Sequence, residues 1–274
     1  MIDFCGLITE CKALAKHTGT LLLQFWNQQR DFMVRKKSDG TPVSEADLAA
    51  HQLIKATLQR LTPDIPILSE EDDIPSFEQR QLWREYWLID PLDGTRGFLE
   101  HDFEFSVNIA LIRQHQPVIG LLYIPNGSIC YYAWQGGGAF KQISDQPPIS
   151  LTQFHKNQPK NWKVLIGKYS RGKKLATLIG NTCDFQILRA NGSIKYGMLA
   201  DRAADLYPRL SPIYEWDTGA GQCILEQSGG CVVDLQGKAL QYNRKPSLQT
   251  GAFIALADSN DQDFWLKILK GEIS

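Results

Sequence analysis

The chain has 274 residues, of which 43% are hydrophobic, and a formal net charge of -1. This length and apolar content allow a large buried core in one or two domains and exclude a disordered chain. The near-neutral charge offers no general attraction for nucleic acid or an anionic membrane. We therefore expect no nucleic-acid partner, and any anionic ligand needs a local binding site.

The six cysteines are scattered, mostly in apolar surroundings, with no C-x-x-C pair and no metal-ligand spacing. This pattern is typical of reduced core residues rather than of a disulfide framework. The N-terminal stretch carries Asp3 and Glu10 and lacks a signal-peptide layout. No apolar run approaches the roughly 20 residues that span a bilayer. We therefore expect a cytoplasmic protein.

The first half of the chain predicts two helices and a sheet. Apolar residues recur at steps of three and four from Phe4 to Trp26, which indicates a long amphipathic helix. A loop is expected at 36–42, followed by a second helix from Ser44, as the N-cap, to about Arg60, with Asp47 completing a capping box. Short apolar runs predict buried strands at 65–68, 86–89, 105–113, 117–124 and 128–134. We expect a substantial antiparallel sheet flanked by helices.

After the polar stretch 144–161, strands and helices alternate. Strands are expected at 163–167, 183–188, 204–210, 231–235 and 252–257, and helices at 170–180, 192–200, from Asp217 to Gly229 and from about Asp261. This alternation favours an α/β arrangement, so the polar stretch is the predicted domain boundary. The predicted fold class is α/β, with an α+β N-terminal domain at 1–150 and an α/β C-terminal domain at 151–274.

Acidic side chains lie next to the ends of the predicted elements. Asp90 ends the apolar run 86–89 and Asp93 follows three residues later, while Glu70 and Asp217 adjoin other element ends. Burial of a carboxylate without a positive partner is costly. Element ends can present side chains into a shared crevice, and Mg²⁺ prefers carboxylate, carbonyl and water oxygens. A metal is therefore the expected positive partner of these acids.

Each of these residues also has a purely local explanation, which the local sequence leaves open. Asp47 can be only the third residue of a capping box, and Asp217 only an N-cap. Glu70 can belong to a solvated acidic loop, and Asp90 can begin an ordinary turn before Pro91. Simple turn chemistry also accounts for Thr95.

Three motifs occur together in the order SEED (69–72), DPLDGT (90–95) and WDTGAG (216–221). With them, the chain resembles the lithium-sensitive, Mg²⁺-dependent phosphomonoesterases that include inositol monophosphatase and fructose-1,6-bisphosphatase. Within this family it is most similar to the bacterial 3'(2'),5'-bisphosphate nucleotidases, through PVSEADLAAH, LTPDIPILSEED, YWLIDPLDGT, FSVNIALI and LYPRL. The resemblance covers nearly the whole chain and implies a layered αβαβα sandwich.

The resemblance also implies a role for each motif residue. Two or three Mg²⁺ ions would be bound by the carboxylates of Glu70, Asp90, Asp93 and Asp217 and by the backbone carbonyl of Leu92. Thr95 and Asp47 would orient and deprotonate the water that attacks phosphorus. Substrate contacts are expected from some of the same residues, namely Glu70, Gly94, Thr95 and Asp217.

Residues that select the substrate are expected in the second half. Ser193 and Lys195 lie at a predicted helix start, where free N–H groups and a cation suit a second phosphate. Arg209 offers a bidentate phosphate contact, near the position where inositol-specific relatives carry an acid. The basic run 168–174 is more typical of a solvated face than of a ligand site.

The chain departs from its nucleotidase relatives at two places. GKYS (167–170) replaces S-R-S-H, so a nucleotide-contacting histidine is missing, and Gly97 replaces a glutamate. Neither change removes a metal ligand. These departures therefore bear on the substrate and not on the type of reaction.

The expected function is Mg²⁺-dependent hydrolysis of the 3'-phosphate of adenosine 3',5'-bisphosphate, and of 3'-phosphoadenylyl sulfate, in sulfur metabolism. The alternatives are an inositol or sugar monophosphatase of the same family, and a nonenzymatic metal- or phosphate-binding protein. An intact Asp47 and Thr95 pair counts against the nonenzymatic alternative. Bacterial relatives associate peripherally with the cytoplasmic face of the inner membrane, which keeps that location open here, and the oligomeric state is also open.

Overall fold

The computed structural model describes residues 4–28, 35–36, 42–151, 161–170, 172–180 and 182–272, and the side chain of Lys174 is not described. Two sequence predictions fall partly outside these residues. They are the loop at 36–42 and the domain boundary at 144–161, whose residues 152–160 are not described. Arg171 of the basic run also lies outside the described residues.

The larger of two main sheets has seven strands in the order β3-β4-β5-β6-β7-β8-β9. Strands β3 and β4 are parallel, and all other neighbours are antiparallel. The strands are β3 (Ile67–Ser69), β4 (Glu85–Asp93), β5 (Ser106–Arg113), β6 (Gln116–Ile124), β7 (Ile129–Trp134), β8 (Gly138–Ile143) and β9 (Ile149–Ser150). The predicted antiparallel sheet of the first half is thus confirmed.

The smaller sheet has five strands in the order β11-β10-β12-β14-β13. Strand β10 is parallel to β11 and β12, whereas β14 is antiparallel to β12 and β13. The strands are β10 (Trp162–Gly167), β11 (Phe185–Ala190), β12 (Leu206–Arg209), β13 (Cys231–Asp234) and β14 (Phe253–Leu256). A separate two-stranded pair consists of β1 (Arg35–Lys36) and β2 (Pro42–Val43).

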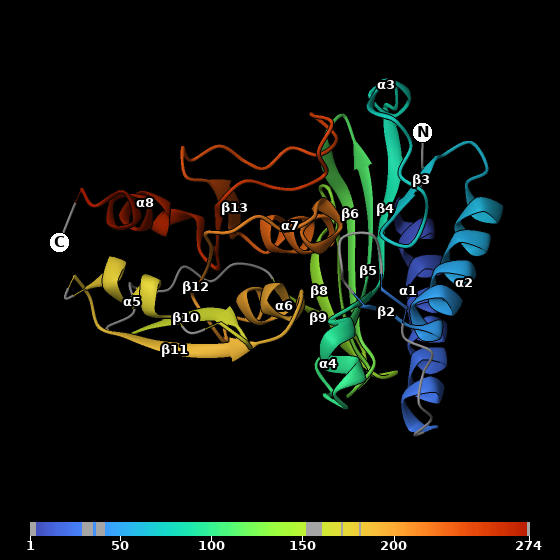
Figure 1. The fold of residues 1–274 in the computed structure, drawn as a ribbon, viewed down its shortest axis with the longest axis horizontal. Helices are drawn as coiled ribbons and strands as arrows, with labels where there is room; N and C mark the ends of the chain where they lie inside the picture. The colour runs from blue at the N-terminus through green and yellow to red at the C-terminus, as the bar shows by residue number, and fades with distance from the viewer. Residues whose placement is uncertain are drawn as a thin grey trace.

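Helices cover both main sheets, and together they form five layers (Figure 1). Helices α1 and α2 cover one face of the larger sheet, α6 and α7 lie between the two sheets, and α5 and α8 cover the far face of the smaller sheet. The helices are α1 (Phe4–Asn27), α2 (Glu45–Leu61), α3 (Phe77–Arg80), α4 (Thr95–Leu99), α5 (Lys173–Ile179), α6 (Ile194–Ala200), α7 (Gly219–Gln227) and α8 (Gln262–Lys270), with 3₁₀ turns η1 (Glu215–Asp217) and η2 (Ser259–Asp261). The expected αβαβα sandwich is confirmed.

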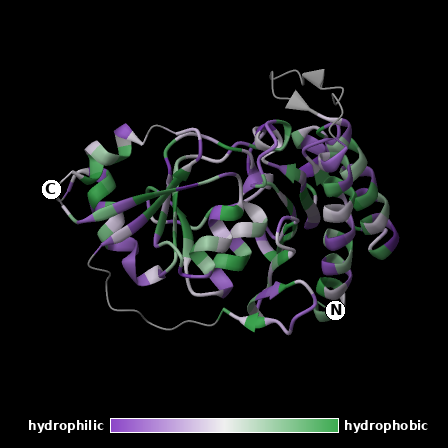
Figure 2. Cartoon of the chain, turned by 90° about the horizontal axis from the view of Figure 1, so that it is seen from below, coloured by the Kyte–Doolittle hydropathy of each residue, from purple (hydrophilic) through white to green (hydrophobic). Residues whose placement is uncertain are grey.

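The central strands are buried along almost their whole length because helices pack on both faces of the larger sheet. Figure 2 shows that the helices carry both hydrophobic and hydrophilic residues. The six cysteines all lie among the described residues and are thiols rather than disulfides, as expected. Among the described residues, the helices are all too short or too polar to cross a membrane.

The structure differs from the predicted elements near the acidic motifs. Strand β4 continues beyond the predicted end at Ile89 to Asp93, with a register shift between Asp90 and Asp93. The helix expected from Asp217 begins at Gly219 instead, because Asp217 closes the preceding 3₁₀ turn. Strand β8 and the short helices α3 and α4 were not predicted. The division into domains at residue 150 stays a prediction.

Candidate active site

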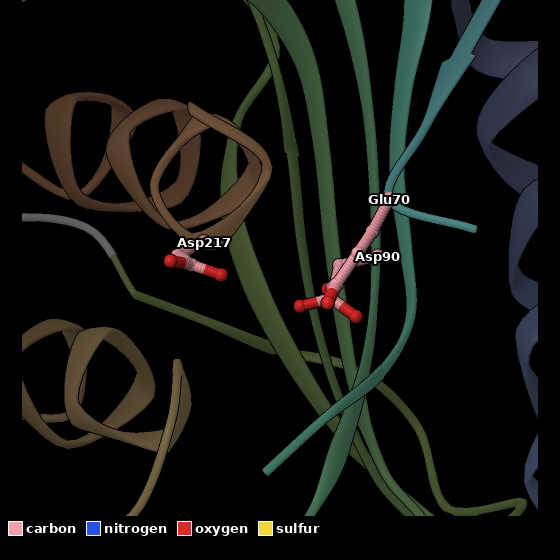
Figure 3. Close-up of side chains that lie close together, drawn as sticks. All are labelled: Glu70, Asp90 and Asp217. Carbon is pink, nitrogen blue, oxygen red and sulfur yellow. The ribbon is translucent and has the colours of Figure 1, made fainter. Parts of the chain in front are cut away.

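Three acidic side chains from separate parts of the chain meet at one end of the larger sheet. Glu70 directly follows β3, and its N–H donates to the carbonyl of Ile89 at 3.2 Å, which fixes it beside β4 and Asp90. Asp217 comes from η1 and lies across from Glu70 and Asp90. One carboxylate oxygen each from Glu70, Asp90 and Asp217 lies within 4.8 Å of the others, and Figure 3 shows the three side chains pointing toward one another.

The electrostatics of this acidic triad favour a cation. Burial, reinforced by the charges of Glu70, Asp93 and Asp217, raises the pKa of Asp90 well above its usual value. Burial and the charges of Asp93 and Glu70 likewise raise the pKa of Asp217. The converging carboxylates repel one another when all of them are ionised. A hard divalent cation prefers oxygen ligands of this kind and can bind between them. The residues present therefore fit a magnesium-type site.

Asp93 faces the C-terminal half of the chain. Its Oδ2 accepts a hydrogen bond from the Ser193 N–H, and the Asn108 amide donates to the same atom at 3.4 Å. Gly192 adopts a φ of +46°, and a Cβ at this position would lie 2.6 Å from Asp93 Oδ2. The turn before α6 therefore requires glycine here to approach the carboxylate.

Thr95 connects the DPLDGT motif to α2. Its hydroxyl lies 3.1 Å from Oδ1 of Asp47 and 3.0 Å from the carbonyl oxygen of Leu92. The hydroxyl has one proton, so it donates to one of these two oxygens at a time. Gly94 precedes it with a φ of +93°, and a Cβ there would come within 3.0 Å of the Glu104 carbonyl. The turn that places Thr95 thus depends on glycine.

Asp47 is part of the predicted capping box and also faces Thr95. It is buried, and its Oδ2 accepts from the Ser44 backbone N–H at 2.7 Å and from the Ser44 hydroxyl at 2.5 Å. The predicted capping box is confirmed. Because Oδ1 faces Thr95, the helix cap also fixes the orientation of the carboxylate toward the DPLDGT motif.

A pocket of about 410 Å³ adjoins the acidic side chains. Its lining includes five of the predicted site residues: Asp93, Ser193, Lys195, Arg209 and Asp217. It also includes residues 167–170, where the sequence departs from its nucleotidase relatives. Within the described part of the chain, the lining residues do not include Glu70, Gly94 or Thr95.

The Lys195 and Ser193 side chains hold the turn before α6. The Lys195 ammonium is buried and donates to the backbone carbonyls of Ala190, at 3.3 Å, and Gly192. Burial lowers the pKa of this group to about 8. The Ser193 hydroxyl donates to the Asp217 carbonyl at 3.0 Å. Lys195 therefore stabilises the turn itself and Ser193 connects the turn to Asp217, whereas a direct contact of either side chain with phosphate stays a prediction.

Arg209 lies at the end of β12 with its guanidinium anchored by backbone oxygens. Nε donates to the Ser211 carbonyl at 3.0 Å, and Nη2 lies 3.5 Å from the Pro212 carbonyl. The charge of Arg209 helps to lower the pKa of Lys195 and opposes the rise in the pKa of Asp217. The guanidinium thus lies close enough to both groups to act on an anion in the pocket.

Asn108 is a site residue that the sequence reasoning missed. It lies in β5, and its amide nitrogen donates to Ser193 Oγ at 2.8 Å. Its buried Oδ1 has no hydrogen-bond partner among the described residues. An amide inside the apolar run FSVNIALI is unusual, and this signal was available in the sequence.

Gly97, the second position at which the sequence departs from the expected pattern, lies close to a residue of the pocket wall. A Cβ at residue 97 would lie 2.6 Å from Nδ2 of Asn191, whose backbone N–H donates to Glu104 at 2.9 Å. Asn191 lines the pocket. Gly97 thus allows helix α4 to pack directly against the pocket wall.

The acidic cluster lies at the end of a sheet, beside a pocket in which backbone oxygens hold the Arg209 guanidinium. This arrangement is typical of an enzyme that binds divalent metal and phosphate esters. The model of the inositol monophosphatase family matches residues 7–269, and the chain belongs to this family. Metal dependence is typical of the family.

Three relatives are similar over most of their length. The chain is 38% identical to the 3'(2'),5'-bisphosphate nucleotidase CysQ of Salmonella typhimurium, with 88% of this chain and 95% of the relative covered. It is also 38% identical to the protein of the same name from Aggregatibacter actinomycetemcomitans, with 96% of each covered. The crystal structure of CysQ from Bacteroides thetaiotaomicron superposes with a TM-score of 0.80 at 28% identity, covering 92% of this chain and 97% of that one.

Proposed function

We propose that this protein is a Mg²⁺-dependent 3'(2'),5'-bisphosphate nucleotidase that hydrolyses the 3'-phosphate of adenosine 3',5'-bisphosphate. The observation that carries the proposal is the shared pocket, in which Asp93 and Asp217 adjoin the anchored Arg209. This arrangement supports a substrate with two phosphates, one at the acids and one at the arginine. The names of the CysQ relatives support the same substrate.

Two or three Mg²⁺ ions would be held by Glu70, Asp90, Asp93, Asp217 and the Leu92 carbonyl. When bound, the ions neutralise phosphate oxygens and lower the pKa of a water molecule, which suits phosphoryl transfer. Burial, followed by repulsion from the neighbouring acids, raises the pKa values of Asp90 and Asp217. Bound cations would relieve this repulsion, which supports the assignment. No serine or cysteine nucleophile is required.

Thr95 and Asp47 would prepare the attacking water. Participation of the Leu92 carbonyl in metal binding would leave Oδ1 of Asp47 as the acceptor for the Thr95 proton. The Thr95 oxygen could then accept a hydrogen bond from the water. The water proton would pass through Thr95 to Asp47 while the new oxygen–phosphorus bond forms. The bond to the ribose oxygen would break, and that oxygen would take a proton from solvent water and leave as the hydroxyl.

Arg209 would bind the phosphate that is not cleaved. A guanidinium suits phosphate oxygens because it presents several N–H groups in one plane. The pocket volume of about 410 Å³ lies within the usual range for small-molecule sites. An inositol or sugar monophosphate would leave Arg209 without a phosphate partner, so the bisphosphate is favoured. 3'-Phosphoadenylyl sulfate, which also carries an anion at the 5' side, is a second expected substrate.

The test is phosphate release in Mg²⁺ from adenosine 3',5'-bisphosphate, adenosine 3'-monophosphate and inositol 1-phosphate. We expect kcat/KM to be highest for the bisphosphate, and release to stop when the metal is chelated. Higher kcat/KM for inositol 1-phosphate would favour the inositol monophosphatase alternative. Metal-stimulated ligand binding without release from any substrate would favour a binding protein.

A further inference from the structure

A buried arginine lies in the chain segment that connects β3, which Glu70 follows, to β4, which contains Asp90. Arg80 ends helix α3 and is only 1% exposed. Its guanidinium donates to the Asn243 side-chain oxygen and to the backbone carbonyls of Pro246 and, at 3.1 Å, Lys245. Asn243 returns a hydrogen bond from its amide nitrogen to the Arg80 carbonyl at 2.6 Å. The two residues are therefore joined in both directions.

Asn243 continues this connection to the turn that carries Asp217. Its backbone N–H lies 3.0 Å and 2.9 Å from the two carboxylate oxygens of Glu215, which is 2% exposed. Glu215 begins η1, and Asp217 ends it. Asn243 has a φ of +54°, in the left-handed region that asparagine adopts more readily than most residues other than glycine. Asn243 therefore suits this turn and contacts both Arg80 and Glu215 from it.

The same turn is also packed against β4. Trp216, between Glu215 and Asp217, lies in one apolar cluster with Tyr86 and Leu88 of β4. Asp90 lies two residues beyond Leu88 in that strand. The apolar contact of Trp216 thus holds the turn with Asp217 against the strand with Asp90. The hydrogen bonds of Asn243 connect the same turn to Arg80.

Burial of a charged guanidinium is expensive, and a well-packed apolar side chain can often replace it without loss of stability. The Nε atom of Arg80 is buried and has no hydrogen-bond partner within the described residues, which adds to the cost. The hydrogen bonds of its guanidinium lead to the segment 243–246, where Asn243 contacts Glu215, and its other face lies over the Phe77 ring. A role of Arg80 in positioning the segment 243–246 therefore explains this arrangement better than a contribution of Arg80 to the free energy of folding.

We propose that Arg80 is a positioning residue that, through Asn243 and Glu215, sets the separation of Asp217 from Glu70 and Asp90. This inference rests on the proposed metal site. Ligands that converge on a metal must be held within about 0.5 Å of the productive geometry, so a small movement of η1 weakens binding. Residues that orient metal ligands typically change metal affinity by roughly 10- to 100-fold when they are replaced.

The test measures Mn²⁺ binding by isothermal titration calorimetry, without substrate, to the parent and three variants. Arg80→Met keeps an apolar chain of similar length and removes the donors. Asn243→Gly keeps the N–H that binds Glu215 and suits the left-handed backbone, but removes the link to Arg80. Arg84→Met is the matched control, because Arg84 is an exposed arginine in the same segment.

We expect Arg80→Met and Asn243→Gly to weaken Mn²⁺ binding by at least tenfold, and Arg84→Met to leave it within twofold of the parent. Melting temperatures in a chelator report the effect on the fold separately. Unchanged Mn²⁺ affinity in Asn243→Gly overturns the inference, and this variant decides the question even where Arg80→Met does not fold. A parent protein that binds no Mn²⁺ would instead contradict the proposed function.

Discussion

The Thr95 hydroxyl lies 3.1 Å from Oδ1 of Asp47, although the two residues are 48 positions apart in the chain. The other oxygen of the same carboxylate belongs to the capping box at the start of α2. One side chain thus stabilises a helix and faces the proposed catalytic hydroxyl. These two contributions can be separated by experiment, because they use different oxygens.

We expect Asp47→Asn to lower kcat for phosphate release by at least 100-fold. General-base catalysis typically contributes about 10²- to 10⁴-fold, and an amide cannot take up the proton at Oδ1. The affinity for Mg²⁺, measured by titration calorimetry, should change little, because Asp47 is not among the proposed ligands. The melting temperature should fall by a few degrees because the capping box weakens.

Ser44→Ala is the control for this prediction. It removes the cap hydroxyl, at a cost of about 0.5–2 kcal/mol, while the carboxylate at residue 47 remains. The melting temperature should fall by an amount comparable to that in Asp47→Asn, and kcat should stay within a few-fold of the parent. If the two variants lose stability to a similar extent and both retain kcat, Asp47 is only a capping residue.

A second prediction concerns the effect of pH and of bound Mg²⁺ on the thermal stability of the protein. The pKa values of Asp90 and Asp217 are raised in the metal-free fold, so the folded state binds more protons than the unfolded chain. The stability that these protonated groups contribute is fully present below about pH 4 and is lost as pH rises through their folded pKa values. Mg²⁺ needs the ionised carboxylates, so its stabilising effect should grow over the same range.

Thermal melts between pH 5 and pH 8, with Mg²⁺ and with a chelator, measure this difference. The increase in melting temperature caused by Mg²⁺ should rise with pH in the parent. Asp90→Asn should greatly reduce the increase at every pH, whereas Asp73→Asn, an exposed acid close to Glu70, should retain it. An increase in melting temperature that does not depend on pH would contradict the assignment of the acidic triad as the metal site.

The elements with strong local patterns could be predicted from the sequence. The periodic apolar residues of α1 and the Ser44 capping box gave two helices nearly to their ends. Helix α4 was missed because it has only five residues, begins at the last residue of the DPLDGT motif and lacks an apolar period. The end of η1 at Asp217 was missed because an acid before a helical pattern looks like an N-cap in the sequence.

The prediction of the candidate site from the sequence has a similar limit. The acidic residues could be singled out because carboxylates at the ends of apolar runs are unusual, and the resemblance supplied their proposed roles. The direction of the Lys195 ammonium could not be predicted, since it depends on the carbonyls of the turn that ends at Ser193. Arg80 was missed because nothing in its local sequence distinguishes a buried arginine from the exposed Arg84 nearby.

A third prediction compares Arg209 with Lys195. Arg209→Ala should remove most of the preference for adenosine 3',5'-bisphosphate over adenosine 3'-monophosphate in kcat/KM. A hydrogen bond to a charged group is worth about 1.5–3 kcal/mol, so the ratio should fall on the order of tenfold to a hundredfold. The slower monophosphate reaction should be nearly unchanged, because it does not use the second phosphate.

Lys195→Met should behave differently. The Lys195 ammonium holds the carbonyls of the turn whose Ser193 N–H donates to Asp93, so its loss should lower kcat/KM for both substrates by similar factors. Kinetics of the two variants on both nucleotides make the comparison. Equal losses on both substrates in Arg209→Ala would mean that Arg209 supports the fold or the acidic site rather than the second phosphate.

The last prediction concerns Tyr169, in the segment 167–170 where the family resemblance led us to expect a histidine. Its ring is 46% exposed, lines the pocket, and is fixed by its hydroxyl, which donates to Glu100 at 2.8 Å. The Arg96 guanidinium lies 4.2 Å from the ring centroid and covers one face. If the protein is a nucleotidase, the exposed part of this immobilised ring should stack against the base of the substrate.

Stacking of a base on an aromatic ring is worth about 1–3 kcal/mol, so Tyr169→Ala should raise KM for adenosine 3',5'-bisphosphate on the order of tenfold. Tyr169→Phe keeps the ring and should retain most of the affinity. Phe103→Ala is the matched control, because Phe103 is 47% exposed, packs on Trp26 and lies outside the pocket lining. The decisive comparison uses 1,4-anhydroribitol 3,5-bisphosphate, which has both phosphates and no base. If Tyr169→Ala raises KM equally for this compound, the ring does not contact the base, and its role is to hold the pocket wall against helix α4.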